Sequence, residues 1–307
     1  MKNALIYNYN IYVDDLVFLN DNYYFKFQNN DYVVSSFTRN INEAISIYKL
    51  NIDMLNKNFI TYRIVLTKDN NILFIYNDTY YILMIIPKIK NRLITLNDIL
   101  KFNYEVYDKD ILKLDKSNWS YYWENKIDYI EEQFYLVKLK YPVINNTIDY
   151  YIGLWENGIS YFNFNNLGMK QKKVIGHKRL GVNTDLYYFL NPINLLVDYK
   201  ERDIGEYLKS YIYSKNWTIK DLDKFFDSLN LNKESVMLLI TRILFPSYYF
   251  DMYEDIVLDN KDENMIKKVI NNKNIIVLLK YLFNKYSSYN IPLIEWIKNE
   301  EEKSTSH

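Results

Sequence analysis

The placement of glycine constrains this chain more than any other feature of its sequence. Only six of the 307 residues are glycine, and the first of them is Gly153. Turns of the GxGxxG kind and Walker-type loops both need glycine where the backbone approaches a phosphate. The first half of the chain therefore contains neither a dinucleotide-binding turn nor a P-loop.

The absence of cysteine and the scarcity of histidine exclude several kinds of site. Without cysteine the chain has no disulfide framework, thiol nucleophile, zinc finger or iron–sulfur cluster. With His177 as the one internal histidine, besides His307, a multi-histidine metal site is excluded. The 38 basic and 38 acidic residues give 38 − 38 = 0 net charge, which disfavours a nucleic-acid partner.

No segment of the chain is apolar enough to span a bilayer. The longest apolar run, residues 80–87, is far shorter than the ~20 residues of a membrane span. The first residues also lack the pattern of a signal peptide. We therefore expect synthesis in the cytoplasm and no membrane span.

The first ninety residues alternate like β-strands, with one helix among them. Residues 16–27 form two strand-like runs around Asn20, Asp21 and Asn22, and further strands are predicted over 31–37, 62–66, 72–76 and 80–86. Residues 40–57 have helical periodicity, with Asn40 as a candidate N-cap and Glu43 three residues later. This pattern predicts an antiparallel meander with one inserted helix.

The rest of the chain is mainly helical. Helices are predicted over 95–102, 119–137, 204–213, 219–228, 235–257, 263–272 and 275–286, with short strands over 159–164 and 195–199. The sequence thus predicts an α+β fold with a small β-rich lobe (residues 1–90) and a larger helical lobe (91–307). This is the anatomy of a bilobal kinase-like fold.

A chemically distinctive segment lies within residues 176–205. His177, Lys178 and Arg179 follow a strand-like piece, and Asp198 ends the next strand, a position where a carboxylate can hold magnesium. Asp203 is a candidate N-cap of the following helix, with Glu206 three residues on. The alternative interpretation is a capped helix start with a surface loop.

Several ordered stretches resemble the spore-coat-associated kinase-like proteins of the YutH group. Residues 149–161 (DYYIGLWENGISY) are similar to that group's "PYYLGLTENAIQY", and 198–207 (DYKERDIGEY) to its "DHPSRDLAEW". Residues 177–179 resemble part of "CHERF", 244–251 (LFPSYYFD) resemble "LLFPLHYFE", and 291–296 (IPLIEW) match "IPxIxWL". The resemblance covers roughly residues 95–297 and marks Glu156, Asn157, Arg202 and Asp203 as structural positions.

The resemblance implies an aminoglycoside phosphotransferase or choline kinase-like fold, whose active members carry His-Gly-Asp-x-x-x-x-Asn. Here Lys178 and Arg179 stand at the Gly and catalytic Asp positions, and Thr184 stands at the Asn position. A guanidinium stays protonated and cannot act as a general base. Asp198 alone survives as a candidate metal ligand.

The small lobe lacks the nucleotide-anchoring parts that the resemblance implies. The strand that should carry the anchoring lysine offers only Val33, Val34, Ser35 and Ser36. Glu43, the expected helix partner, is left without that lysine, and no glycine forms a phosphate-covering loop. These losses indicate a degenerate catalytic site.

The leading hypothesis is therefore a pseudokinase without a cofactor that associates with other coat proteins of the endospore. By resemblance it is made in the mother cell of a spore-forming, low-GC Gram-positive bacterium and acts as a coat component or assembly factor. One alternative is an atypical small-molecule or protein phosphotransferase that uses ATP and magnesium through Asp198. Another is a pseudokinase that senses a small ligand in the cleft between its lobes.

Overall fold

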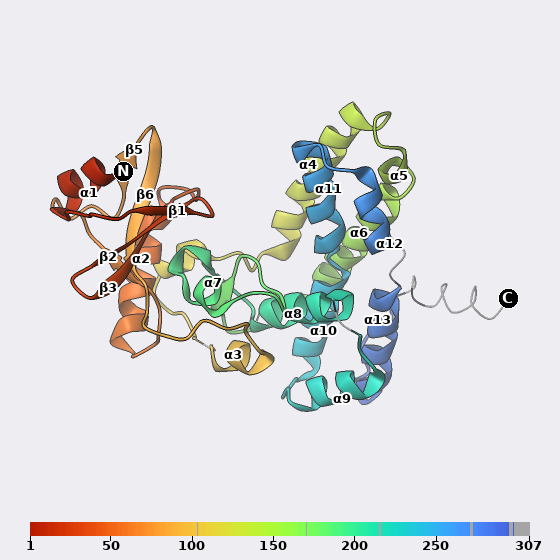
Figure 1. The fold of residues 1–307 in the computed structure, drawn as a ribbon. Coiled ribbons are helices and arrows are strands. Elements are labelled where there is room, and N and C mark those ends of the chain that lie inside the picture. The colour runs from red at the N-terminus through yellow and green to blue at the C-terminus, as the bar shows by residue number, and fades with distance from the viewer. Residues whose placement is uncertain (103, 170, 215, 271–272, 295–296, 298–307) are drawn as a thin grey trace. The chain divides into compact units, whose positions relative to one another are not determined.

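The computed structural model describes residues 1–102, 104–169, 171–214, 216–270, 273–294 and 297 (Figure 1). The chain divides into two compact units. The first, here the β-rich unit, comprises Met1–Asp115, Val174–Arg179 and Asn183–Asp198. The second, the helical unit, comprises Lys116–Lys173, Leu180–Val182 and Tyr199–His307. The predicted division at residue 90 stays a prediction.

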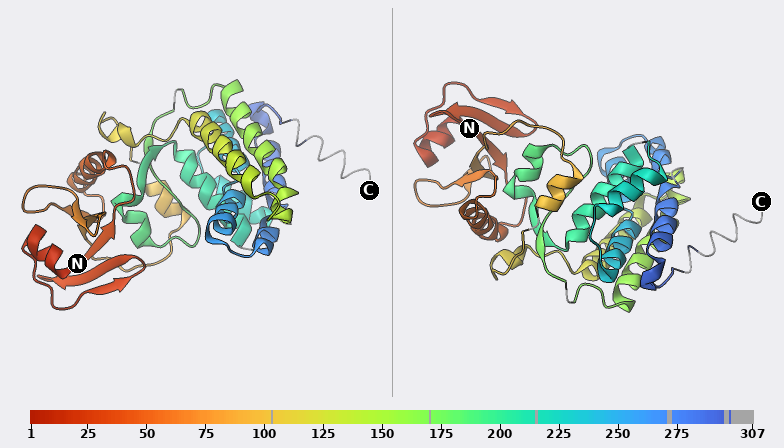
Figure 2. Two further views of the ribbon diagram at one scale, coloured as in Figure 1. Left: turned by 90° about the horizontal axis from the view of Figure 1, so that it is seen from above. Right: turned by 90° about the horizontal axis from the view of Figure 1, so that it is seen from below.

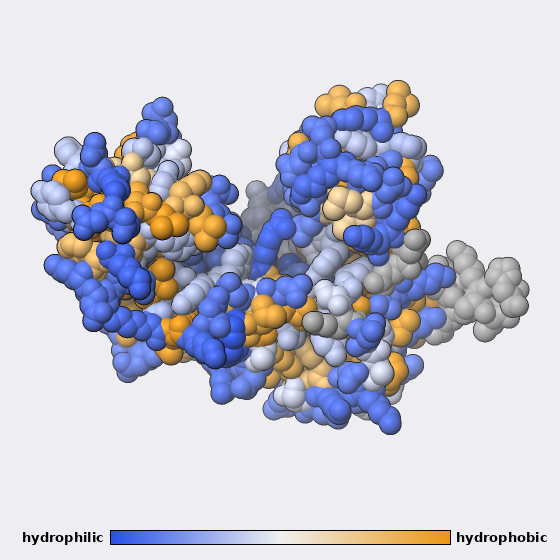
Figure 3. Space-filling model, in the orientation of Figure 1, coloured by the Kyte–Doolittle hydropathy of each residue, from blue (hydrophilic) through white to orange (hydrophobic). Residues whose placement is uncertain are grey.

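An antiparallel sheet forms the centre of the β-rich unit. Its strands are β1 (Val17–Leu19), β2 (Asn22–Phe27), β3 (Asn30–Ser36), β4 (Arg63–Val65), β5 (Phe74–Tyr76) and β6 (Thr79–Ile85). The hydrogen-bonded order is β1-β2-β3-β6-β4, and β5 also pairs with β6. The edge strand β1 is apolar yet exposed, and Figure 3 shows apolar surface over this hairpin.

Tight turns built on asparagine and aspartate join these strands. Leu19 pairs directly with Asn22, so the β1–β2 turn consists of Asn20 and Asp21, both with positive φ. The β2–β3 and β5–β6 turns also have two positive-φ residues each, Gln28–Asn29 and Asn77–Asp78. Asn and Asp tolerate the left-handed region better than other side chains do, which explains how the hairpins form without glycine.

Helices cover both faces of this sheet. Figure 2 shows α1 (Lys2–Tyr9) and α2 (Glu43–Asn56) on opposite sides of the strands. Leu5 of α1 packs with Val34 and Leu83 in one apolar cluster. On α2 the buried residues Ile47, Leu50 and Met54 recur at helical spacing. The sequence did not predict α1.

The remaining elements of the β-rich unit include a two-stranded ladder. β7 (Val174–His177) and β8 (Leu195–Asp198) pair antiparallel, with Val174 opposite Asp198 and His177 opposite Leu195. Between them lie α7 (Leu186–Leu190) and the 3-10 turn η2 (Pro192–Asn194). α3 (Leu96–Lys101) and η1 (Ile111–Leu114) precede them in the chain.

The helical unit is built around a central buried helix. Its elements are α4 (Trp119–Val137), α5 (Pro142–Asn145), α6 (Ile148–Phe164), α8 (Lys200–Ser214), α9 (Ile219–Asp227), α10 (Lys233–Leu244), α11 (Ser247–Asp259), η3 (Glu263–Ile266), α12 (Lys267–Ile270), α13 (Asn274–Lys285) and η4 (Ser287–Tyr289). Every residue of α10 from Ser235 to Leu244 is buried. In the part of the chain that the structure describes, no helix is both long and apolar enough to cross a membrane.

Glycines allow close approach between these helices. A Cβ on Gly205 would lie 2.8 Å from the Arg242 Cγ atom, and one on Gly158 would lie 3.4 Å from the Leu244 Cβ atom. α8 and α6 can therefore approach α10 closely. These two glycines serve helix packing.

The predicted meander was wrong beyond β3, because β6 lies between β3 and β4 in the sheet.

Four local predictions were also wrong. Residues 159–164 are not a strand but the end of α6. The predicted helix 235–257 is two helices, because Pro246 lacks an amide N–H and holds Phe245 extended. α8 begins at Lys200, so Asp203 lies inside its first turn and is not its N-cap. α2 begins at Glu43, so Asn42 and not Asn40 directly precedes it, although the Asn40 Oδ1 atom accepts a hydrogen bond from the Asn42 N–H at 2.9 Å in the turn before the helix.

Two predictions fall partly on residues outside the described part of the chain. The predicted helix 263–272 includes residues 271–272, and the motif at 291–296 includes residues 295–296, which lie outside the described residues.

Candidate functional site

His177, where the resemblance places the catalytic loop, is a buried residue of the β-rich unit. It ends β7 with 1% of its surface exposed. Its Nε2 donates to the carbonyl oxygen of Phe189 at 2.9 Å, and its ring stacks on Phe189 with centroids 4.2 Å apart. The imidazole thus holds α7 against β7 through packing and a backbone hydrogen bond.

The residues after His177 leave the ladder in a bend. The amide N–H of Lys178 donates to the carbonyl of Asn194 at 2.9 Å, which extends the β7–β8 pairing by one bond. The residue Arg179 is exposed. The carbonyl of Thr184, at the predicted magnesium-ligand position, accepts a hydrogen bond from the Ile94 N–H at 2.9 Å. Lys178 and Thr184 therefore both contribute backbone groups to the β-rich unit.

Asp198, the candidate metal ligand, is completely buried at the end of β8. Because His177 pairs with Leu195 and Asp198 pairs with Val174, the two residues lie at opposite ends of the ladder. Three residues of strand separate these ends, about 10 Å at ~3.3 Å per residue. Among the described residues, no group of three or more His, Asp and Glu side chains could hold a metal ion.

The segment in which the resemblance led us to look for the anchoring lysine is strand β3. The strand reads Asn-Asp-Tyr-Val-Val-Ser-Ser, and its central residues Tyr32–Ser35 are buried. The preceding β1–β2 turn is only two residues long and has no glycine. Without glycine, this turn carries side chains where a phosphate-covering loop needs bare backbone.

A large cavity of about 1080 Å³ adjoins this sheet within the β-rich unit. Its lining comes from residues 12–32, from Tyr62 and Ile86, and from the segment 185–194. The charged residues in that lining are four carboxylates and one amine, namely Asp14, Asp15, Asp31, Asp185 and Lys26. Burial and the nearby Asp185 carboxylate raise the pKa of Tyr24 above its usual value. The cavity therefore has a negative electrostatic character.

Glu43 does not stand alone at the start of α2. Its Oε2 atom lies 2.6 Å from the Nε of Arg39, and the two side chains are 18% and 3% exposed. The same guanidinium donates through Nη1 to the carbonyls of Ile193 and Leu195. Arg39 thus links the β3–α2 corner to the backbone around η2 and β8. This arginine was not predicted, because it lies beyond the end of the strand.

The residues marked as structural lie on two helices of the helical unit. On α6, Glu156 is exposed, whereas Asn157 is half-buried and donates through Nδ2 to the Gly153 carbonyl at 2.7 Å. On α8, Asp203 is buried and Arg202 is half-buried. Arg202 is close enough to Glu206 to help lower the pKa of its carboxyl group. Their structural roles stay predictions.

A buried charge cluster in the helical unit was missed altogether. Glu206 lies 2.8 Å from the Lys209 Nζ and 2.6 Å from the Arg242 Nε, while Ser247 donates to its other oxygen at 3.2 Å. Burial opposes ionisation of Glu206, but the Lys209 and Arg242 charges outweigh it and lower its pKa to about 2. Burial lowers the pKa of Lys209 to about 8, although Glu206 acts in the opposite direction. The available signal was the opposite charges of Glu206 and Lys209 three residues apart on one helix.

Comparisons with known proteins agree with the resemblance. The family model described as "Spore coat putative kinase YutH" matches residues 2–277. The "Endospore coat-associated protein YutH" of Bacillus subtilis (strain 168) is 24% identical over 222 residues, covering 65% of each chain. The present chain therefore spans just under two thirds of the length of that curated relative.

Solved structures show the same fold at low sequence identity. Spectinomycin phosphotransferase APH(9)-Ia, in complex with ADP and spectinomycin, is 14% identical with a TM-score of 0.55 over 92% of both chains. An aminoglycoside phosphotransferase from Alicyclobacillus acidocaldarius is 9% identical with a TM-score of 0.59, over 99% of this chain and 97% of that one. The predicted fold class, a small antiparallel β-rich part with a helix and a larger helical part, is thereby confirmed.

Proposed function

The chain belongs to the spore coat putative kinase YutH family, and on that premise we propose that it is a catalytically inactive kinase-fold protein of the endospore coat. Its role is that of a coat component or assembly factor. It associates with other coat proteins and uses neither nucleotide nor metal.

The main support for this proposal is the set of residue types in strand β3 and in the β1–β2 turn. Strand β3 contains no lysine or arginine, and the β1–β2 turn contains only Asn20 and Asp21. Phosphoryl transfer depends on positioning the phosphates and neutralising their charge. Neither β3 nor this turn supplies a cation or a glycine-rich loop for that purpose.

The surrounding residues also do not fit a magnesium–nucleotide complex. The cavity beside the sheet has four carboxylates and a single lysine in its lining, so it repels a polyphosphate. Of the positions taken from the family pattern, only Asp198 offers a magnesium ligand. Because magnesium sites draw on more than one protein or phosphate oxygen, Asp198 alone is not enough to hold the ion. We therefore derive no catalytic step through ATP.

A thermal-shift titration tests the absence of nucleotide binding. A ligand that binds only the native state raises the melting temperature as its concentration exceeds its Kd. We expect no change in Tm on addition of ATP and magnesium, for the natural chain and for Asp198→Ala alike. A concentration-dependent rise in Tm that Asp198→Ala abolishes would contradict the proposal.

That second outcome would support the alternative function, an atypical small-molecule or protein phosphotransferase. The observation in its favour is the complete burial of Asp198 at the end of a strand. Loss of a general base alone does not abolish phosphoryl transfer, because positioning and electrostatic stabilisation supply most of the catalysis.

Coat association is proposed from the family and from the name of the Bacillus subtilis relative. The protein is expected to be made in the mother cell and to be recovered with the endospore coat. Fractionation of purified spores from the source organism, followed by detection with a specific antibody, tests this. Recovery only in the core fraction, or absence from spores, would contradict coat association.

A further inference from the structure

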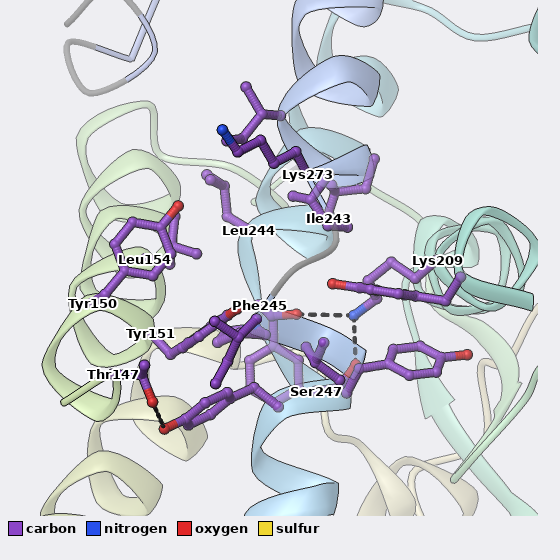
Figure 4. Close-up of a pocket in the computed structure, with 18 of the residues that line it drawn as sticks. Thr147, Tyr150, Tyr151, Leu154, Lys209, Ile243, Leu244, Phe245, Ser247 and Lys273 are labelled. Atoms are coloured by element: carbon purple, nitrogen blue, oxygen red, sulfur yellow. Dashed lines mark hydrogen bonds between the residues drawn. The ribbon is translucent and has the colours of Figure 1, made fainter. Parts of the chain in front are cut away.

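The β-rich unit has exposed carboxylates that no described residue balances. Asp14 and Asp15 line its cavity of about 1080 Å³, and neither carboxylate has a partner in the described part of the chain. Lys209, which lines a cavity of about 350 Å³ in the helical unit, differs because it donates to the Phe245 carbonyl at 3.0 Å and to the Ser247 hydroxyl at 2.8 Å (Figure 4). The β-rich unit therefore leaves negative charge for a partner to balance.

These carboxylates adjoin β1, an apolar edge strand whose outer side is open. Among the described residues β1 pairs with β2 alone, and Val17, Phe18 and Leu19 are 57%, 59% and 57% exposed. The edge strand β4, at the other end of the strand order, carries the charged Arg63 and has Ile64 only 4% exposed. Charged or covered edges resist further pairing, whereas an exposed apolar edge favours the addition of another strand.

The register of the first hairpin directs the backbone of Phe18 away from β2. Leu19 and Asn22 flank the two-residue turn and therefore form a hydrogen-bonded pair. Such pairs alternate with non-hydrogen-bonded ones along an antiparallel ladder, and Phe18 opposite Tyr23 is of the second kind. The Phe18 N–H and C=O thus point to the open side, where an added strand would satisfy both groups.

Acidic residues flank both ends of β1. Asp14 and Asp15 precede the strand, and Asp21 follows it in the β1–β2 turn. All three are exposed, and the Asp21 carboxylate also has no partner among the described residues. An incoming strand therefore meets negative charge at each end and apolar side chains between.

The basic side chains close to this hairpin are engaged elsewhere. The Lys2 amine donates to the backbone carbonyl of Asp14 and not to its carboxylate. Lys26 of β2 pairs with Asp31 of β3 at 3.4 Å. Neither amine therefore neutralises the carboxylates at the ends of β1.

The same charges disfavour a second copy of this chain as the occupant. An antiparallel pair of β1 strands centred on Phe18 would place Asp15 of each copy opposite Asp21 of the other. Like charges directly opposite each other destabilise a sheet. Charge complementarity instead favours a strand with a cation at each end.

From this geometry we infer that β1 pairs with an extended segment of a partner protein, apolar opposite residues 17–19 and with lysine or arginine at both ends. Main-chain hydrogen bonds to Phe18 hold the segment, and its cations balance the flanking carboxylates. Val17, Asp14 and Asp15 all line the cavity beside the hairpin, which gives long basic side chains room to extend. The inference rests on the proposed association with other coat proteins and states the chemistry of such a partner.

Fluorescence anisotropy of the labelled peptide Lys-Thr-Val-Ile-Val-Thr-Lys-Lys, titrated with the full chain, tests this inference. In antiparallel pairing its isoleucine lies opposite Phe18 and its lysines lie opposite Asp14, Asp15 and Asp21. We expect saturable binding, and binding about tenfold weaker or more when glutamate replaces each lysine, since three surface attractions become repulsions. Proline in place of the isoleucine removes the N–H that faces Phe18 and is expected to abolish binding. No saturable binding up to about 1 mM chain, or equal binding of either altered peptide, would overturn the inference.

Variants of the chain show whether the peptide binds at β1. Phe18→Pro removes the outward N–H at an edge position, where proline is tolerated, and is expected to abolish binding. Asp14→Asn, Asp15→Asn and Asp21→Asn combined are expected to weaken it several-fold. Asp78→Asn is the matched control, because Asp78 is the second residue of the β5–β6 turn with a φ of 57°, close to the 59° of Asp21. Equal binding by the triple variant and the natural chain would overturn the inference even if Phe18→Pro failed to fold.

Sedimentation velocity distinguishes a partner protein from a second copy. We expect the natural chain to be monomeric, whereas a dimer that Phe18→Pro dissociates would show that β1 pairs with itself and would overturn the inference. Failure of peptide binding would leave recovery of the protein in the endospore coat unchanged. Absence of the protein from spores would leave peptide binding unchanged, so the two proposals fail separately.

Discussion

Arg39 and Glu43 form a part-buried ion pair at the corner where β3 leads into α2, with 2.6 Å between Nε and Oε2. The same guanidinium donates to the backbone carbonyls of Ile193 and Leu195. Glu43, which was expected to be left without a lysine partner from the strand, thus pairs with an arginine four residues before it. The guanidinium connects elements that lie more than 150 residues apart in sequence.

Arg39→Met is expected to destabilise the β-rich unit by about 2–3 kcal/mol, because it removes a buried guanidinium together with its hydrogen bonds to Glu43, Ile193 and Leu195. Urea denaturation followed by circular dichroism measures this loss. Lys113→Met is the matched control, since Lys113 pairs with Asp110 at 2.8 Å but is 66% exposed. Equal losses from the two variants would contradict a structural role for Arg39.

Gly168→Ala is expected to destabilise the helical unit by about 2 kcal/mol or more, because both the left-handed backbone and an overlap cost free energy. Gly168 has a φ of +83°, and a Cβ there would lie 2.1 Å from the Tyr199 hydroxyl oxygen. Thermal unfolding of the variant and the natural chain measures the loss.

The control for this change is Gly153→Ala, which meets no atom within 4 Å inside α6. Alanine favours a helix interior over glycine, so this variant is expected to gain up to about 1 kcal/mol. A stabilising Gly168→Ala would contradict the packing of Gly168 against Tyr199.

Glu206 is expected to make the protein sensitive to acid. Its pKa in the folded state, about 2, lies below its ordinary value of 4.5. Its contribution to the free energy of unfolding is therefore fully present above pH 4.5 and is lost as the pH falls toward 2. The loss amounts to roughly 3 kcal/mol, since each tenfold change in proton affinity is worth ~1.4 kcal/mol.

The test is the free energy of unfolding measured by denaturation between pH 6 and 3. It should fall less steeply for Glu206→Gln than for the natural chain, and the two slopes should differ by the equivalent of about half a bound proton or more. Parallel curves for the two chains would contradict the assignment.

Buried tyrosines are expected to make stability fall in alkali. Burial raises the pKa of Tyr9 and Tyr161 well above 10. The folded chain therefore keeps protons that the unfolded chain releases, and the stability that these groups contribute is present below about pH 10 and is lost above it. A tyrosinate absorbance titration should show some of the 33 tyrosines ionising only as the chain unfolds. Ionisation of all of them before any loss of circular dichroism would contradict this burial.

Much of the fold could be predicted because local patterns and tertiary packing agree. The helix 119–137 was predicted with the bounds of α4, since its apolar residues recur at helical spacing, and the structure adds a cap by the Asn118 side chain. The hairpins followed from Asn and Asp between β-rich runs. Where the two levels conflict, prediction failed: residues 159–164 are rich in β-formers, yet packing of α6 against α10 keeps them helical.

The candidate site was less accessible to sequence reasoning. Residue identities alone led to the prediction that β3 lacks an anchoring lysine and that the first turn lacks glycine, and both stay predictions about the site. The Arg39 hydrogen bonds to Ile193 and Leu195 join distant segments, as does the ion pair of Glu206 with Arg242, and no local period reveals such pairings. The same is true of the cavity in the helical unit, which several helices enclose together.

Release of phosphate from γ-labelled ATP tests the central claim, catalytic inactivity, most directly. The natural chain and Asp198→Ala would be incubated side by side with millimolar ATP and magnesium, with and without small-molecule acceptors. Catalytic inactivity predicts label release and transfer that are the same for both chains and equal to the protein-free background. Release or transfer by the natural chain that Asp198→Ala abolishes would contradict it.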